Sequence, residues 1–168
     1  MSDAGAAATT VKQGWQRRVV APIVAQLRQG VTPPQIALAL AAGSVIGIFP
    51  ILGATTLLCA MFAFVLKLNQ PVIQLVNYLI YPLQIALLFP FYRAGEKLFG
   101  QTPVPLLSIG ELNTRFWAAP GQFLIDYGLV ALYGATVWTL LAPALAALIY
   151  LLLKPALTRL AGRLDRRP

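Results

Sequence analysis

The chain has 168 residues, of which 58% are hydrophobic and only 11% are charged, and its mean hydropathy is +0.73. This composition leaves too little polar surface to solvate a globule of this size, so it excludes an ordinary water-soluble domain and favours an integral membrane protein. The formal net charge is +8, and the chain has one cysteine and no histidine, so an intrachain disulfide is excluded and the commonest zinc ligand is missing.

The N-terminal region is polar and basic. We expect residues 1–10 to be a disordered tail and residues 11–30 to form an amphipathic helix on the anionic cytoplasmic face of a membrane. One face of this helix repeats apolar side chains every four positions: Trp15, Val19, Ile23 and Leu27. A basic stretch also suits nucleic acid, but no aromatic platform or known motif accompanies it, so nucleic acid is not a predicted partner.

Three long segments carry no charged side chain at all, namely residues 29–66, 68–92 and 127–153. A helix needs about 20 mostly apolar residues to cross a hydrocarbon core of about 30 Å, whereas a buried helix of a soluble domain rarely continues so far without a charge. The sequence therefore predicts a membrane domain over residues 31–153, with the lipid bilayer as its main partner, and leaves an unusually apolar soluble helical bundle as the alternative.

The first charge-free segment is too long for one span and is interrupted near its middle. A straight helix through it would be about 46 Å long at 1.5 Å per residue. Pro50 cannot donate a backbone hydrogen bond, and Gly47 and Gly53 flank it, Gly53 tolerating the left-handed conformation that a tight reversal often needs. The simplest structure is a re-entrant hairpin of two half-helices, residues 35–49 and 54–66, that enters and leaves by the cytoplasmic face.

The distribution of charge predicts the topology. Residues 1–35 contain four Lys or Arg residues and one Asp, and residues 154–168 contain five Lys or Arg residues and one Asp. The loop 93–126 contains three positive and three negative residues. By the positive-inside rule both termini are cytoplasmic, with residues 154–168 as a basic tail. Two cytoplasmic termini require an even number of crossings. A re-entrant hairpin with full spans at 70–92 and 127–153 satisfies this requirement, and so does a hairpin that makes two full crossings of a thinner bilayer.

Small residues recur at helical spacing in two segments. Ala39, Gly43 and Gly47 step by four, which is the spacing that lets two helix backbones approach closely in a membrane. A second stripe of small residues runs along the last span: Gly128, Ala131, Ala135, Thr139, Ala142 and Ala146. We interpret both stripes as helix-packing surfaces.

The middle span has a polar face. Its side chains step by four, three, four and three positions and share one side of a helix: Gln70, Gln74, Asn77, Tyr81 and Gln84. Two interpretations are open. The five side chains either form interhelical hydrogen bonds, or they face a hydrated cleft opposite the broken hairpin and line a substrate site, as in transporters with discontinuous helices.

The remaining segments predict short interfacial helices. Ser108 and Glu111 have capping-box spacing before Phe116 and Trp117, which favours a short helix at the outer interface. The C-terminal residues alternate leucines with arginines at helical spacing, as an interfacial helix does. The fold class that follows is an all-α membrane protein: a broken helical hairpin plus two transmembrane helices, with interfacial amphipathic helices at the ends.

The sequence contains no catalytic pattern. Glu96 lies between Arg93 and Lys97 and balances their charge, while Glu111 and Asp126 fit the roles of cap and boundary residues. No phosphate-binding glycine loop, nucleophile elbow or metal-ligand spacing is present. We therefore expect no catalytic residues, no metal, no cofactor and no enzymatic activity.

Several motifs resemble those of a bacterial family, domain of unknown function 2062. They are the Pro-Gln-Ile-Ala sequence at 34–37, Gly43 and Gly47, the Phe-Pro-Ile-Leu-Gly turn at 49–53, Asn69 and Pro71 of the Leu-Asn-Gln-Pro sequence that follows, and the Tyr-Arg-Ala-Gly sequence at 92–95. The resemblance implies a small multi-pass protein of the bacterial cytoplasmic (inner) membrane, of unassigned activity. Members are sometimes joined to glycosyltransferase domains.

Two functions remain in view. The first is transport or handling of a lipid or small amphiphile through a cleft between the broken hairpin and the polar-faced span. The alternative is a non-catalytic membrane scaffold, which binds itself as a homo-oligomer or serves as an accessory subunit of a membrane enzyme such as a glycosyltransferase.

Overall fold

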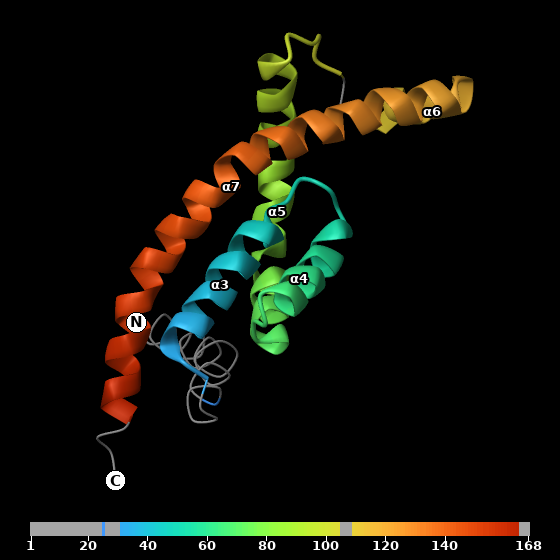
Figure 1. Ribbon diagram of the computed structural model, residues 1–168. Coiled ribbons are helices and arrows are strands. Elements are labelled where there is room, and N and C mark those ends of the chain that lie inside the picture. The colour runs from blue at the N-terminus through green and yellow to red at the C-terminus, as the bar shows by residue number, and fades with distance from the viewer. Residues whose placement is uncertain (1–24, 26–30, 105–108, 165–168) are drawn as a thin grey trace, which may run out of the picture.

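The computed structural model describes residues 25, 31–104 and 109–164, and this part of the chain is helical, with no strand. Its helices are α3 (Pro33–Gly47), α4 (Ala54–Val65), α5 (Gln70–Leu98), α6 (Ile109–Ala118) and α7 (Pro120–Leu164). Figure 1 shows α3 and α4 as a hairpin, with α3 packed against both α5 and the long, curved α7. The predicted all-α class is confirmed, while the tail 1–10 and the helix 11–30 lie outside the described residues, Ala25 apart.

The hairpin breaks where the sequence predicts. Thr32 and Gln35 form a capping box at the start of α3, and α3 ends at Gly47. Pro50 is buried in the turn, and Gly53 has a φ of 83°, the left-handed conformation that glycine adopts without strain. α4 then runs back along the molecule in the opposite direction (Figure 1). The chain is therefore not a continuous rod through Pro50.

A tight turn joins α4 to α5. Lys67 has a φ of 51°, and the amide of Leu68 donates to the Ala63 carbonyl at 2.8 Å, as at many helix C-termini that end on a left-handed residue. The Asn69 side chain then accepts from the Val72 amide at 3.1 Å and caps α5, with Pro71 in the first turn. The Leu-Asn-Gln-Pro motif is thus a helix-start signal.

The core lies where α3 crosses α5. A Cβ atom on Gly43 would lie 2.8 Å from the Ile73 carbonyl oxygen and 3.0 Å from Val76 Cβ, so only glycine allows this approach. Ala39 is fully buried in the same interface. The predicted packing role of the first small-residue stripe is confirmed.

A second close crossing joins α5 to α7. A Cβ atom on Gly95 would lie 2.5 Å from the carbonyl carbon of Tyr133, and one on Gly134 would lie 2.7 Å from the Tyr92 ring. α7 continues for 45 residues with Pro143 inside it, and it bends around the hairpin (Figure 1).

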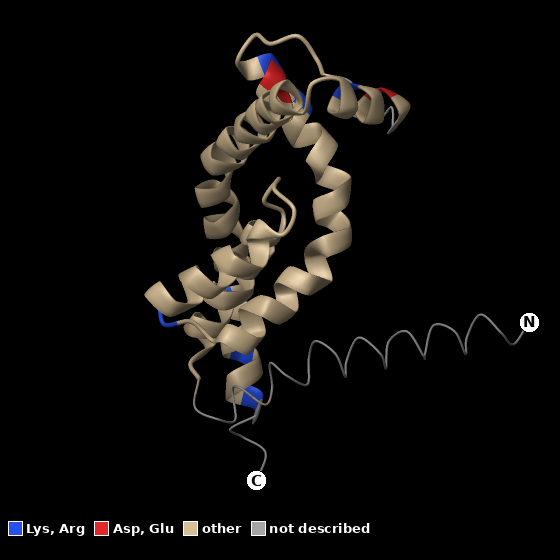
Figure 2. Ribbon diagram, turned by 90° about the vertical axis from the view of Figure 1, so that its right-hand side faces the viewer, with Lys and Arg blue, Asp and Glu red and all other residues tan. Residues whose placement is uncertain are grey.

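Charged residues of the described chain gather at two ends of the molecule (Figure 2). Between them, α5 and α7 are long and apolar enough to cross a membrane, and they contain the predicted spans 70–92 and 127–153. α3 and α4 are apolar but shorter, with 15 and 12 residues.

Candidate functional site

The hairpin turn exposes backbone carbonyls that its own helices do not use. At the end of α3 the Phe49 amide donates to the Ile46 carbonyl at 2.9 Å, so it does not reach the Val45 carbonyl one position earlier. The indole N–H of Trp138, on α7, donates to that Val45 oxygen at 2.9 Å. The Phe49 and Trp138 rings also meet edge to face, with centroids 4.8 Å apart. α7 therefore caps the C-terminal end of α3.

α5 supplies two further donors to the same turn. The Gln84 side-chain amide donates to the Phe49 carbonyl at 2.8 Å, and the Tyr92 hydroxyl donates to the Pro50 carbonyl at 2.7 Å. Gln84 is 1% exposed, so its amide has no access to water. Three side chains from two helices thus bond the carbonyls of Val45, Phe49 and Pro50 at the end of α3 and in the turn, which holds the hairpin in one position against α5 and α7.

The start of α4 is bonded to α5 as well. The Gln74 side-chain amide donates to the Thr56 carbonyl at 3.0 Å, and the Asn77 amide donates to the Thr56 hydroxyl at 3.5 Å. The side-chain oxygens Gln74 Oε1 and Asn77 Oδ1 are buried and accept no hydrogen bond from the part of the chain that the structure describes. These two oxygens can each accept a hydrogen bond from a donor such as a water molecule.

The structure divides the predicted polar face. Three members, Gln74, Asn77 and Gln84, form hydrogen bonds to the hairpin, as the interhelical interpretation expects. Gln70 and Tyr81 are exposed on the surface of α5, and Tyr81 is 50% exposed. A substrate-lining role for the five residues stays a prediction, and neither of the two cavities described below has any of them in its wall.

The first cavity is an apolar groove of about 320 Å³ between the hairpin and α7. Its walls come from α3, α4 and α7, and nearly all of its surface is hydrocarbon. The lining residues are Leu38, Ala42, Val45, Ile46, Phe62, Leu66, Trp138, Thr139, Ala142, Pro143 and Ala146. Small side chains on α7 leave the groove open, so part of the second small-residue stripe lines a cavity and does not pack against another helix.

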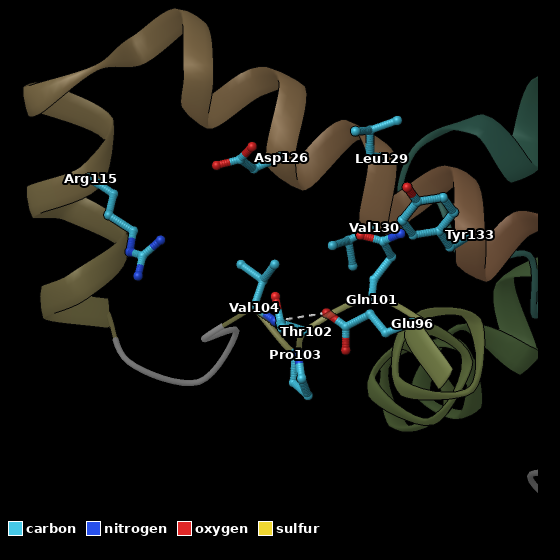
Figure 3. Close-up of a pocket in the computed structure, with 10 residues that line it drawn as sticks. All are labelled: Glu96, Gln101, Thr102, Pro103, Val104, Arg115, Asp126, Leu129, Val130 and Tyr133. Carbon is cyan, nitrogen blue, oxygen red and sulfur yellow. Dashed lines mark hydrogen bonds between the residues drawn. The ribbon is translucent and has the colours of Figure 1, made fainter. Parts of the chain in front are cut away.

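The second cavity, also about 320 Å³, is polar and lies where α5, α6 and α7 meet (Figure 3). Glu96 forms one wall and is 1% exposed. Its carboxylate pairs with Arg93 and accepts from the Val104 amide at 2.9 Å, while Arg93 also donates to the Val104 carbonyl at 2.9 Å. The predicted charge balance between Glu96 and Arg93 is confirmed. The two side chains also hold the loop after α5 against the end of that helix through their bonds to Val104.

Comparison with known proteins identifies the family. Residues 17–164 match the family described as "Uncharacterized protein conserved in bacteria (DUF2062)". The chain belongs to the DUF2062 family. No curated protein and no solved structure matches it. The resemblance noted in the sequence is confirmed over most of the chain, and the family description assigns no activity, so the function of this DUF2062 protein has to be argued from its geometry.

The motifs of this DUF2062 chain mark structural junctions. Gly43 and Gly47 face α5, the turn at 49–53 meets Gln84 and Tyr92, and Asn69 caps α5. Within the described residues no group of three or more His, Cys, Asp or Glu side chains lies close enough together to hold a metal ion.

Sequence reasoning missed two side chains that hold the turn. Trp138 and Tyr92 bond carbonyls 93 and 42 positions away in the chain, and no local pattern reports a contact over such a separation. Tyr92 does belong to the Tyr-Arg-Ala-Gly sequence that resembles the family, which is the one signal that could have pointed to it. Trp138 carries no such signal.

Proposed function

We propose that this DUF2062 protein is an integral protein of the bacterial cytoplasmic membrane that handles a lipid or small amphiphile, holding its apolar chain in the groove between the hairpin and α7. The proposal includes no catalytic activity. The observation that carries it is the groove itself, a hydrocarbon-lined cavity of about 320 Å³ on a surface that is otherwise also apolar.

The exposed surface supports a membrane location. None of the residues in the most hydrophobic 18-residue window of α7 is buried inside the protein, whereas the core helix of a soluble protein would be mostly buried. Large apolar side chains such as Phe64, Leu140 and Leu151 are 86%, 67% and 65% exposed. Large exposed apolar surfaces are typical of sites that contact a membrane or another protein, and the hydrocarbon core of a bilayer would cover these side chains.

The hydrogen bonding of the turn supports the same location. Lipid cannot bond free backbone groups, so irregular backbone at membrane depth occurs only where protein covers it. Donors from Gln84, Tyr92 and Trp138 reach the carbonyls of the turn, and all three donors lie within charge-free segments. In water such carbonyls would find solvent, and a set of three dedicated side chains would be unnecessary.

The charge distribution supports the orientation. One end of the molecule contains the α4–α5 turn with Lys67 and the C-terminal part of α7 with Lys154 and Arg159, and the other contains the end of α5, α6 and the start of α7 (Figures 1 and 2). The first end carries positive charge and the second carries both signs, which is the asymmetry of cytoplasmic and outer faces. We propose that the end with Lys67 is cytoplasmic, with α5 and α7 spanning the bilayer and the hairpin entering it from that side.

The groove can be tested by filling it. We expect Ala142→Leu, alone or with Ala146→Leu, to occupy the space beside Trp138 and to lower the amount of phospholipid that stays bound when the protein is purified in detergent, as measured by mass spectrometry of the extracted lipid. The matched control is Ala144→Leu, because Ala144 is an exposed residue of the same helix outside the groove. Equal lipid content in all variants would refute the proposal.

A second measurement addresses movement of the lipid. In proteoliposomes containing a fluorescent phospholipid, a handling protein exchanges lipid faster than empty vesicles do, and the Ala142→Leu variant should lose that difference. The roles of accessory subunit and homo-oligomer stay predictions, since the small residues Gly43, Gly47 and Gly95 make close contacts within the chain.

A further inference from the structure

We propose that the polar cavity between α5, α6 and α7 binds a zwitterionic phospholipid headgroup, taking its phosphate at Arg115 and its primary ammonium at Asp126. This inference rests on the proposed membrane location and names the lipid class that the protein would handle. It concerns a different cavity from the acyl-chain groove, so the two can fail separately.

Two opposite charges face the cavity from different helices. Arg115 projects from α6 and Asp126 from α7, and both point into the space that Figure 3 shows. They form no ion pair with each other, and neither has an ion-pair partner among the described residues. Asp126 accepts one hydrogen bond, from the Gln122 amide at 2.7 Å, which leaves carboxylate lone pairs for a ligand.

The third charged residue of the wall is already neutralised. Glu96 pairs with Arg93 and accepts the Val104 amide, so its negative charge is balanced inside the protein. The charge that remains toward the cavity is one guanidinium and one carboxylate. A ligand that pairs with both side chains has a negative group for the guanidinium and a positive group for the carboxylate, joined by a short linker. A phosphate with a tethered ammonium meets that requirement, because Arg bonds phosphate in a fork and carboxylates accept from N–H donors.

The size and the place of the cavity fit such a headgroup. Its volume of about 320 Å³ is near the lower end of ligand pockets, which suits a headgroup better than a whole lipid. Glu96, near the C-terminal end of α5, lines it, and Figure 2 shows charges of both signs at this end of the molecule, which is the proposed outer interface. α6 exposes Trp117 there at 74%, and aromatic side chains are enriched at headgroup depth.

α7 lines both cavities in succession. Leu129, Val130 and Tyr133 border the polar cavity, and Trp138 begins the apolar groove five positions later. Five residues of helix span about 7.5 Å, so a headgroup site and a chain site follow each other along α7 in the order that a lipid at the outer interface would need.

The test measures binding of short-chain lipids to the full chain in detergent. Dihexanoyl phosphatidylethanolamine should bind at least about tenfold more tightly than the corresponding phosphatidylglycerol, which lacks the ammonium, and than phosphatidylcholine, whose quaternary ammonium has no N–H donor. Arg115→Gln and Asp126→Asn should each weaken ethanolamine-lipid binding by about tenfold. Lys97→Gln is the matched control, because Lys97 is an exposed cation at the same end but outside the cavity.

Three outcomes would overturn the inference. Phosphatidylglycerol that binds wild-type protein as tightly as phosphatidylethanolamine does would be the first, and this comparison needs no variant to fold. Unchanged binding of the ethanolamine lipid to folded Asp126→Asn protein would show that Asp126 does not bind the ammonium group. Glycerophosphoethanolamine, the free headgroup, must bind at least about tenfold more weakly than the lipid, since equal affinity would mean that the site serves a soluble phosphoester.

The same data separate this inference from the proposed function. If Ala142→Leu lowers bound lipid while Arg115→Gln and Asp126→Asn bind all three headgroups as wild type does, the groove stands and the headgroup site falls. If the two charge variants lose binding while Ala142→Leu retains its lipid, the headgroup site stands and the groove falls. Arg115→Lys, which keeps the charge but not the fork geometry, should retain part of the affinity.

Discussion

At the scale of single residues, the hairpin depends on side chains that replace missing backbone partners. A helix end leaves its last carbonyls free, and a turn of proline and glycine adds more. Here Gln84, Tyr92 and Trp138 each donate one hydrogen bond to that backbone. Losing one donor leaves a buried carbonyl without a partner, which costs more than the net value of the bond itself.

Tyr92→Phe removes only the hydroxyl that bonds the Pro50 carbonyl at 2.7 Å. We expect it to lower the free energy of unfolding by about 1 kcal/mol, the usual value of one such bond. Tyr81→Phe is the control, because it removes the same hydroxyl from a half-exposed position of the same helix and should change nothing. Unfolding of both variants in mixed micelles, followed by circular dichroism, measures the difference. Equal stability of the two would argue against the bond.

Gln84→Leu should be more damaging. It deprives the Phe49 carbonyl of its donor at a site with 1% exposure, so we expect a loss of about 1–3 kcal/mol. Gln70→Leu makes the same change at an exposed position of α5 and should be neutral. The same micelle unfolding experiment compares them. A Gln84→Leu protein as stable as Gln70→Leu would show that the amide does not hold the turn.

At the scale of helices, two glycine crossings set how closely α5 approaches its neighbours. Gly43 brings α3 onto α5, and Gly95 brings α7 onto α5 against the backbone of Tyr133 and Gly134. Backbone atoms cannot move aside as a flexible side chain can, so an added methyl group would push whole helices apart. The positions of the groove and of the polar cavity both depend on these approaches, because α7 borders both.

Gly95→Ala should therefore destabilise the protein by about 1–3 kcal/mol, the usual effect of overpacking, since its Cβ would lie 2.5 Å from the Tyr133 carbonyl carbon. Gly128→Ala is the matched control: Gly128 is an exposed helical position of α7 with nothing within 4 Å of an added Cβ. There alanine should be neutral or stabilising by up to about 1 kcal/mol, because it favours the helix. Denaturant midpoints of both variants would decide, and an unaffected Gly95→Ala would show that the helices are free to separate.

The break in the hairpin could be predicted because the residues of the turn itself determine it. Pro50 removes a donor and Gly53 allows a left-handed φ, and both effects act within a few residues. The start of α5 is local as well, since Asn69 caps it and Pro71 follows in its first turn. Such signals do not depend on the rest of the fold.

The arrangement of the site could be predicted only in part. Periodicity places Gln70, Tyr81 and Gln84 on one side of α5, but it does not tell how far the neighbouring hairpin extends along that side. The hairpin contacts Gln84 and leaves Gln70 and Tyr81 exposed. Likewise, charge marks the edges of the apolar stretch at 127–153 but not the ends of the helix, and α7 in fact runs from Pro120 to Leu164.

At the scale of the whole molecule, the helices of the hairpin are shorter than the two long helices, α5 and α7. α5 has 29 residues and would span about 43 Å, whereas α3 has 15 residues and would span about 22 Å, less than a hydrocarbon core of about 30 Å. The turn bonds Gln84 and Tyr92, which precede Arg93, the first charged residue of α5. The turn therefore contacts the charge-free part of α5, which is the position that the proposed re-entrant hairpin requires.

Cysteine labelling tests this arrangement in a Cys59→Ala background, where the one native thiol is removed from a fully buried position. We expect a membrane-impermeant maleimide added to intact cells to label Trp117→Cys, and to label Lys67→Cys and Arg159→Cys only after permeabilisation, because in the proposed topology the positive end faces the cytoplasm. Leu52→Cys, at the turn, should resist labelling from both sides. Labelling of Leu52→Cys from outside would instead mean that the hairpin crosses the bilayer twice, and labelling of Lys67→Cys and Arg159→Cys from opposite sides would contradict the proposed topology altogether.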